Sequence, residues 1–142
     1  MIFCLQHSAP KIKSVKKEFK HFHYDWSLVT DPGARCENFV GSHLLKWCHF
    51  VEDTEGYEMD LRYFRDREQR EVDFVVLKDQ KPVLFCEVKS TDQAFSPHLR
   101  YLKRKFPQVR AVQITLNPTQ HIISADGLEL MSALDFLREL PV

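Results

Sequence analysis

Two apolar segments that carry acidic side chains, joined by a short polar turn, limit most strongly what this chain can fold into. The segments cover residues 72–77 and 82–88, and only four polar residues separate them. This pattern predicts a β-hairpin. If the hairpin is centred on Gln80, paired residue numbers sum to 160, and Asp73 lies directly across from Glu87.

Strand alternation predicts which side chains share a face. Asp73 is expected on one face with Val75 and Leu77, and Glu87 on one face with Lys89. Two opposed carboxylates repel each other unless a positive charge lies between them. A Mg²⁺ or Mn²⁺ ion is a natural candidate, because hard cations bind carboxylate, carbonyl and water oxygens. Lys89 would then lower the pKa of a bound water or stabilise charge that develops on a phosphate.

A simpler interpretation of the same charges is open at this point. They could face water at the strand ends, with Glu71 and Lys89 forming a cross-strand salt bridge. The two interpretations differ in whether Asp73, Glu87 and Lys89 converge on one point in the fold.

A long helix is predicted over residues 34–51, because Val40 and Leu44 belong to an apolar stripe at helical spacing. Glu37 lies three and seven residues before them, so it falls on the same stripe. A carboxylate that faces a core is costly unless it is paired or linked to a metal. The alternative is a glutamate in the first helical turn, stabilised by the helix dipole, by Arg35 or by a hairpin arginine.

The remaining elements give an α/β pattern. The central order is helix, three strands, helix, strand, followed by a C-terminal helix, which indicates a mixed sheet flanked by helices. The predicted segments are a half-buried strand at 21–26, a turn at 30–33, strands at 57–64 and 109–115, a helix at 96–106, a short apolar run at 122–123 and a helix that begins at Ser132.

Composition excludes several classes of protein. The 142 residues are about the size of one compact domain, and 20 basic residues balance 20 acidic ones. This balance argues against nucleic-acid binding by bulk charge, although it allows a local basic face. The four cysteines are scattered without metal-ligand spacing, and no apolar run approaches the length of a membrane span. A soluble cytoplasmic protein with reduced cysteines is expected.

Basic residues gather in two places. The helix predicted at 96–106 carries Arg100, Lys103 and Arg104 with no acidic residue among them. Beside a metal site these side chains could contact phosphates, although a solvated helix face explains them equally well. The lysines between residues 11 and 20 allow the same two interpretations.

The residues that carry these patterns resemble a known family. Residues 70–75 (REVDFV) and 82–90 (PVLFCEVKS) resemble the C-terminal domain of a class of prokaryotic AAA-type ATPases, domain-of-unknown-function family 4143. That domain is placed in the PD-(D/E)xK, restriction-endonuclease-like superfamily. Residues 36–40 (CENFV) resemble its first core helix, and Asp126-Gly127 with Phe136-Leu137 resembles its C-terminal end. The resemblance covers nearly the whole chain as a single domain, 1–142.

The resemblance implies a role for each acidic residue. Asp73 and Glu87, with the backbone carbonyl of Val88, would hold Mg²⁺ or Mn²⁺, while Lys89 acts on water and Glu37 serves as an accessory acid. Further accessory candidates are Glu71 and Gln113. The implied function is a divalent-metal-dependent nuclease acting on DNA. The alternative is a catalytically inactive nucleic-acid-binding or regulatory module of an ATPase.

The sequence departs from the full-length relatives in one respect. It contains no GxxxxGK motif followed by Ser or Thr, so ATP hydrolysis is not assigned to these residues. We therefore expect a fragment or a stand-alone relative, with an upstream ATPase domain as the partner in full-length relatives.

Overall fold

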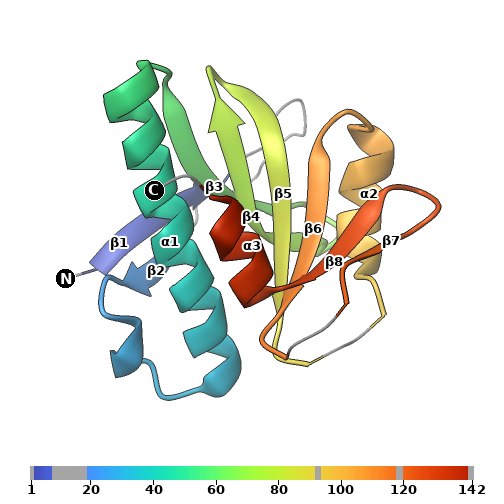
Figure 1. The fold of residues 1–142 in the computed structure, drawn as a ribbon, viewed down its shortest axis with the longest axis horizontal. Helices are drawn as coiled ribbons and strands as arrows, with labels where there is room; N and C mark the ends of the chain where they lie inside the picture. Colours follow the sequence, from blue (N-terminus) through green and yellow to red (C-terminus); the bar gives the residue numbers. More distant parts are fainter. Residues whose placement is uncertain (1, 8–18, 92–93, 118–119, 141–142) are drawn as a thin grey trace.

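The computed structural model describes residues 2–7 by their backbone, and residues 19–91, 94–117 and 120–140 with their side chains. The lysines between residues 11 and 18 lie outside these ranges. One mixed sheet has the strand order β2-β1-β3-β4-β5-β6-β8-β7. Helices α1 and α3 lie on one face and α2 on the other (Figure 1). The strands are β1 (Ile2–His7), β2 (Phe19–His23), β3 (Met59–Arg65), β4 (Glu71–Lys78), β5 (Lys81–Lys89), β6 (Arg110–Thr115), β7 (Ile122–Ile123) and β8 (Leu128–Ser132).

The strands of the sheet run in both directions. Strands β3, β4 and β5 are antiparallel to one another, whereas β5, β6 and β8 run parallel. The predicted α/β class is therefore confirmed, with the predicted helix, three strands, helix, strand at its centre. No helix in the described part of the chain is both long and apolar enough to cross a membrane. The helices are η1 (Trp26–Leu28), α1 (Pro32–Glu55), α2 (Pro97–Lys105) and α3 (Ala133–Glu139).

The core consists of two apolar layers, one on each face of the sheet. The layer under α1 and α3 includes Val40, Leu44, Phe74, Cys86 and Phe136. The layer under α2 has its own set of buried side chains. Because the central strands are covered on both sides, they are apolar along nearly their whole length. The α2 layer includes Val75, Leu77, Phe85, Leu99, Leu102 and Leu128.

Helix α1 begins earlier than the sequence predicted. The Asp31 carboxylate accepts a hydrogen bond of 2.8 Å from the Ala34 N–H, and Pro32 occupies the first helical position. The residues interpreted as a turn at 30–33 are therefore the capped start of the helix. Gly56 caps the end of the helix, and its φ of +76° is the left-handed conformation that glycine adopts most easily.

Two other sequence-based expectations also need correction. The aromatic segment predicted as a strand at 21–26 is extended only as far as His23, and the short helix η1 follows it. Strand β8 was not predicted at all. Its signal was present in the sequence, because Leu128, Glu129 and Leu130 alternate between apolar and charged.

The β4–β5 hairpin reaches the predicted register near its acidic residues by an unexpected route. The turn consists of Asp79 and Gln80, with φ of +49° and +66°, so the pairs beside it are one residue out of the predicted register. An extra residue in β5, Val83, shifts the register back, and Phe74 pairs with Cys86. The predicted turn centre was wrong, and the register next to the acidic residues is confirmed.

A second bulge, in β4, determines where Asp73 lies. Relative to β3, strand β4 carries one extra residue here, so that Asp73 and Phe74 both oppose Tyr63. Bulges redirect side chains. Val75 packs in the α2 layer, whereas the Asp73 carboxylate lies 3.8 Å from the ammonium of Lys20 beside α1. Strict alternation of Asp73 with Val75 was therefore a wrong prediction.

Candidate functional site

The site begins where the pairing between β4 and β5 ends, at Phe74 and Cys86. Beyond this pair, side-chain groups take the place of the backbone hydrogen bonds between the two strands. Oδ2 of Asp73 accepts a hydrogen bond of 2.8 Å from the Val88 N–H. The Asp73 backbone in turn lowers the pKa of the Glu87 carboxyl group. Oδ2 of Asp73 is thus held by the backbone of the opposite strand, and the negative charge of Glu87 acts on Asp73.

Both acids are almost completely buried, with 8% of Asp73 and 7% of Glu87 exposed. Burial raises the pKa of Asp73 well above its ordinary value, and the negative charges of Glu87 and Glu37 raise it further. Burial also raises the pKa of Glu87, although Lys89 opposes that shift. Oε2 of Glu87 is buried without a hydrogen-bond partner. Such an oxygen favours either a proton or a nearby cation.

A lysine from β2 completes the acidic cluster. Nζ of Lys20 lies 2.9 Å from Oε1 of Glu37, 2.5 Å from Oε1 of Glu71 and 3.8 Å from Oδ1 of Asp73. Burial lowers the pKa of Lys20, but the three carboxylates outweigh this effect and hold it well above the ordinary value. The ammonium is therefore charged, and it partly neutralises the cluster.

Sequence analysis missed Lys20 because it was counted with the basic segment at 11–20. A signal was nevertheless present. Alternation in an extended segment places Lys20 on the same face as Phe22, two residues later, and Phe22 is only 5% exposed. Extending the predicted strand backwards by one residue would have directed Lys20 toward the protein interior.

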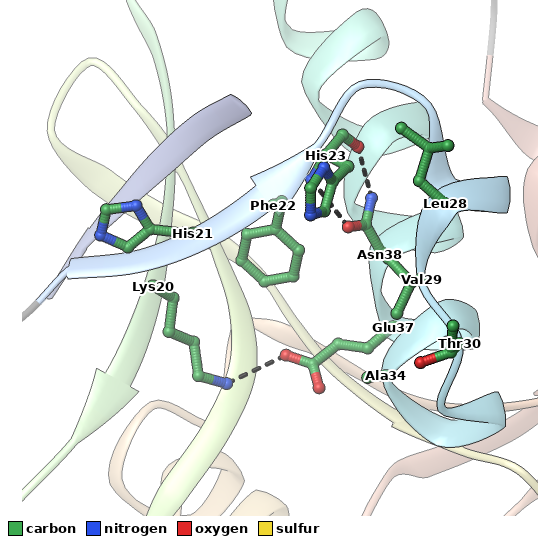
Figure 2. A pocket seen from close by; sticks show the side chains of 10 residues that line it. All are labelled: Lys20, His21, Phe22, His23, Leu28, Val29, Thr30, Ala34, Glu37 and Asn38. Carbon is green, nitrogen blue, oxygen red and sulfur yellow. Dashed lines mark hydrogen bonds and ion pairs between the residues drawn. The ribbon is translucent and has the colours of Figure 1, made fainter. Parts of the chain in front are cut away.

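Asn38 fixes the position of β2 beside helix α1. Its Oδ1 accepts a hydrogen bond of 2.8 Å from the His23 N–H, and its Nδ2 donates one of 2.6 Å to the His23 carbonyl (Figure 2). This clamp brings Lys20 to Glu37, the ion pair that is also drawn in Figure 2. Glu37 is half-buried, as its place on the apolar stripe predicted, and it pairs with Lys20 instead of Arg35.

Lys89 pairs with one of the two buried acids. Its Nζ lies 3.2 Å from Oε1 of Glu87. Glu71 pairs elsewhere, with Lys20 and with Nη2 of Arg65 at 2.8 Å. Among the described contacts, Lys89 therefore pairs with Glu87 and not with Glu71, and the convergence of Lys89 with Asp73 stays a prediction.

Gln113 stands next to Glu87 in the parallel pairing of β5 and β6, and its side chain is completely buried. Its Oε1 accepts a hydrogen bond of 2.8 Å from the Ser96 N–H, and its Nε2 donates one of 3.2 Å to the Ala94 carbonyl. Gln113 thus anchors the segment that leads into α2. Its accessory role in catalysis stays a prediction.

The basic side chains of α2 lie on a helix that covers the other face of the sheet from α1 (Figure 1). The guanidinium of Arg100 lies 2.9 Å from the Asp126 carboxylate. Lys103 donates hydrogen bonds of 2.9 Å to two carbonyls in the segment after the helix, and Arg104 is exposed. Arg100 and Lys103 would have to exchange these internal partners in order to hold a phosphate.

The cysteines with described side chains are free and buried at Cys36, Cys48 and Cys86. Burial raises the pKa of Cys36 to about 11 and that of Cys48 to about 12. Because the thiolate is the reactive form, these thiols are poor nucleophiles.

A pocket of about 480 Å³ lies beside the Lys20–Glu37 ion pair. Figure 2 shows its walls, which include Lys20 and Phe22 from β2, Val29 from the segment after η1, and Glu37 from α1. The acidic cluster therefore borders a hollow large enough to admit water and small groups.

The donor set can be compared with what a divalent ion needs. No three His, Cys, Asp or Glu side chains with described positions form a group that could hold a metal ion by themselves. Mg²⁺ usually keeps several waters and needs only one or two protein carboxylates, with substrate oxygens completing its shell. Asp73 and Glu87 provide that pair, and Oε2 of Glu87 lacks another partner. The residues present therefore fit Mg²⁺ or Mn²⁺.

Residues 32–136 match the family model described as a domain of unknown function, DUF4143. The match covers well over half of the chain and includes α1, the β4–β5 hairpin and β6. No curated protein and no solved structure matches. Lys20 lies outside the matched residues.

Proposed function

We propose that this chain, which belongs to the DUF4143 family, is a divalent-metal-dependent nuclease-like domain of the PD-(D/E)xK type that acts on DNA. The observation that supports this most is the burial of two acids on neighbouring strands, where Oδ2 of Asp73 accepts from the Val88 N–H and Oε2 of Glu87 lacks a partner. Burial and the charge of Glu87 raise the pKa of Asp73, and Oε2 of Glu87 lacks any donor, so the two acids are suited to bind a cation.

The two acids, with the backbone carbonyl of Val88 as a third oxygen, would hold Mg²⁺ or Mn²⁺. When bound, such an ion acidifies water and offsets the charge of phosphoryl oxygens. In phosphodiester hydrolysis, the water oxygen attacks phosphorus while the bond from phosphorus to the leaving sugar oxygen breaks. The water loses a proton, and the leaving oxygen gains one.

The chain's own side chains account for the other requirements. Lys89 is held at 3.2 Å by Glu87, so its ammonium can orient the attacking water and donate hydrogen bonds as negative charge develops on the phosphate. Glu37 is half-buried and close enough to raise the pKa of both buried acids. It is the accessory acid that can accept the proton lost by water, and solvent supplies the proton for the leaving oxygen.

One observation favours a second candidate function. Lys20 already neutralises part of the cluster, with contacts to Glu37, Glu71 and Asp73. A nuclease-like domain whose acids are satisfied by a lysine would serve as a catalytically inactive nucleic-acid-binding or regulatory module. Its partner would be the ATPase domain of an AAA-type protein.

Cleavage assays test the first candidate. The purified chain is incubated with supercoiled plasmid, single-stranded DNA and RNA, with Mg²⁺, with Mn²⁺ or with chelator. Asp73→Ala and Lys89→Ala are expected to abolish cleavage without loss of folding. Asp53→Ala and Lys46→Ala, which change exposed residues of α1, are the matched controls and should cleave normally. Metal-independent cleavage, or cleavage that survives Asp73→Ala, would contradict the proposal.

Calorimetric titration with Mn²⁺ separates the two candidates. Binding that is lost in Asp73→Ala supports the metal site, whereas no binding at millimolar Mn²⁺ supports the inactive module. A mobility shift of DNA in chelator would further favour a binding function for that module.

A further inference from the structure

Lys20 occupies a place in the acidic cluster that a metal ion would otherwise share. Its ammonium contacts Glu37 and Glu71 within 3 Å and lies 3.8 Å from Asp73, just beyond hydrogen-bonding distance. It also lies 5.4 Å from the centre of the Tyr63 ring, on the side of the sheet under α1. A single positive charge therefore serves several carboxylates at the edge of the site.

We propose that Lys20 is a displaceable counter-ion, which holds the acidic cluster when no metal is bound and competes with a divalent ion for it. This inference rests on the metal site of the proposed function and adds a residue that controls its affinity. Like charges that share a small, poorly solvated volume repel each other strongly. A divalent ion that binds Asp73 and Glu87 would therefore be repelled by the ammonium of Lys20.

The division of contacts within the cluster supports competition over a fixed structural role. Lys20 is hydrogen-bonded to Glu37 but not to Asp73, and Oε2 of Glu87 has no partner. The charge of Lys20 thus leaves the two deepest acids incompletely satisfied. A second cation would therefore be attracted to Asp73 and Glu87, and it would bind close to the ammonium of Lys20.

The surroundings of Lys20 leave room for its side chain to move. It lies on β2, which is the edge strand of the sheet, and 21% of its side chain is exposed. The pocket of about 480 Å³ is lined by Lys20 itself and by Glu37 (Figure 2). Because the lysine side chain is a flexible four-carbon stem, the ammonium can move toward this pocket without a change in the backbone of β2.

The test compares the Mn²⁺ affinity of the wild type with that of Lys20→Met, Lys20→Arg and Lys78→Met, measured by calorimetry. Lys78→Met is the matched control, because Lys78 is also partly buried on a strand and lies 3.6 Å from the centre of the Tyr57 ring. Lys20→Met should bind Mn²⁺ about tenfold more tightly than the wild type, the size of an ordinary coupling between two sites. Lys20→Arg should keep the wild-type affinity or bind more weakly, and Lys78→Met should be unchanged.

The outcomes separate this inference from the proposed function. If the wild type binds Mn²⁺ and loses it in Asp73→Ala, the metal site stands; equal or weaker binding by Lys20→Met then overturns the counter-ion role alone. If the wild type and Lys20→Met both fail to bind, the metal site and the counter-ion role fail together.

A labelling experiment on the wild-type protein covers the case in which Lys20→Met does not fold. An amine-selective reagent is applied with and without Mn²⁺, and modification of Lys20 and Lys46 is measured by mass spectrometry. Displacement predicts that Mn²⁺ increases the labelling of Lys20 several-fold and leaves the exposed Lys46 unchanged. Labelling of Lys20 that stays constant or falls would overturn the proposal.

Discussion

Oδ2 of Asp73 accepts a hydrogen bond of 2.8 Å from the backbone N–H of Val88, the residue that follows Glu87 on the neighbouring strand. This bond lies where the backbone hydrogen bonds between β4 and β5 would otherwise continue, and it holds the Asp73 carboxylate beside β5. The Asp73 backbone in turn lowers the pKa of Glu87. The Asp73 carboxylate is therefore held by a backbone donor before any ion arrives, which favours a preorganised site.

Asp73→Asn should stabilise the metal-free protein. The amide keeps an oxygen that can accept from the Val88 N–H, but it removes a buried negative charge that burial and the charges of Glu87 and Glu37 destabilise. We expect an increase of about 1 kcal/mol in the free energy of unfolding, because a buried charge is removed. Urea denaturation in chelator measures it, with Asp53→Asn as the control. A variant less stable than the wild type would show that the charge of Asp73 is already well compensated.

The metal-free protein should lose stability as pH rises above the ordinary carboxyl range. Asp73 and Glu87 have raised pKa values in the folded state, so the folded protein binds more protons than the unfolded chain. Stability therefore falls with increasing pH, starting near the ordinary pKa values of 3.8 and 4.5 and continuing to the raised ones.

Urea denaturation in chelator from pH 4 to pH 8 checks this dependence. Other groups titrate in the same range, so the quantity to compare is the difference between the wild type and Asp73→Asn. That difference should grow with pH. A constant difference would mean that Asp73 titrates alike in the folded and unfolded states.

Asn38→Ala should destabilise the protein and weaken the Lys20–Glu37 pair. The substitution removes both hydrogen bonds to the His23 backbone, so the part-buried N–H and carbonyl of His23 each lose their bond to Asn38. We expect a cost of about 2 kcal/mol. Chemical denaturation measures it, and Thr54→Ala is the control because Thr54 makes one exposed bond within α1. A cost as small as that of Thr54→Ala would show that β2 is held by other contacts.

Gly41→Ala should also be destabilising, because α1 packs closely on Phe74 at this point. A Cβ at Gly41 would lie 2.8 Å from Cζ of the buried Phe74 ring. The ring of Phe74, which follows Asp73 in the sequence, would have to move, at a cost of about 1–3 kcal/mol. Gly33→Ala is the matched control, since its Cβ would meet only Oδ2 of Asp31 at 3.4 Å. Thermal unfolding should give a lower Tm for Gly41→Ala than for the wild type, whereas the Tm of Gly33→Ala should not fall.

Much of the site could be predicted from sequence because local patterns determine it. The two apolar runs of the hairpin are close together, so few registers are available, and the predicted one holds at Phe74 and Cys86. The agreement arose because two deviations from the predicted hairpin cancel each other. The turn is one residue out of the predicted register, and the bulge at Val83 compensates for it.

The remaining features depend on contacts between distant segments, which periodicity does not encode. Lys20 and Glu37 are far apart in sequence, and only the packing of β2 beside α1 brings them together. Asn38 was not singled out, because an asparagine on a helix has no distinctive pattern until its partner at His23 is known. The basic residues of α2 were considered as phosphate ligands, whereas Arg100 and Lys103 have partners within the fold.

The most direct test of the account is a crystal structure of the wild-type protein grown with millimolar Mn²⁺, with anomalous scattering used to locate the ion. The account predicts a manganese peak bonded to carboxylate oxygens of both Asp73 and Glu87, with the ammonium of Lys20 moved away from Asp73. An absent peak at that position, with Lys20 still seated between Glu37 and Glu71, would contradict it.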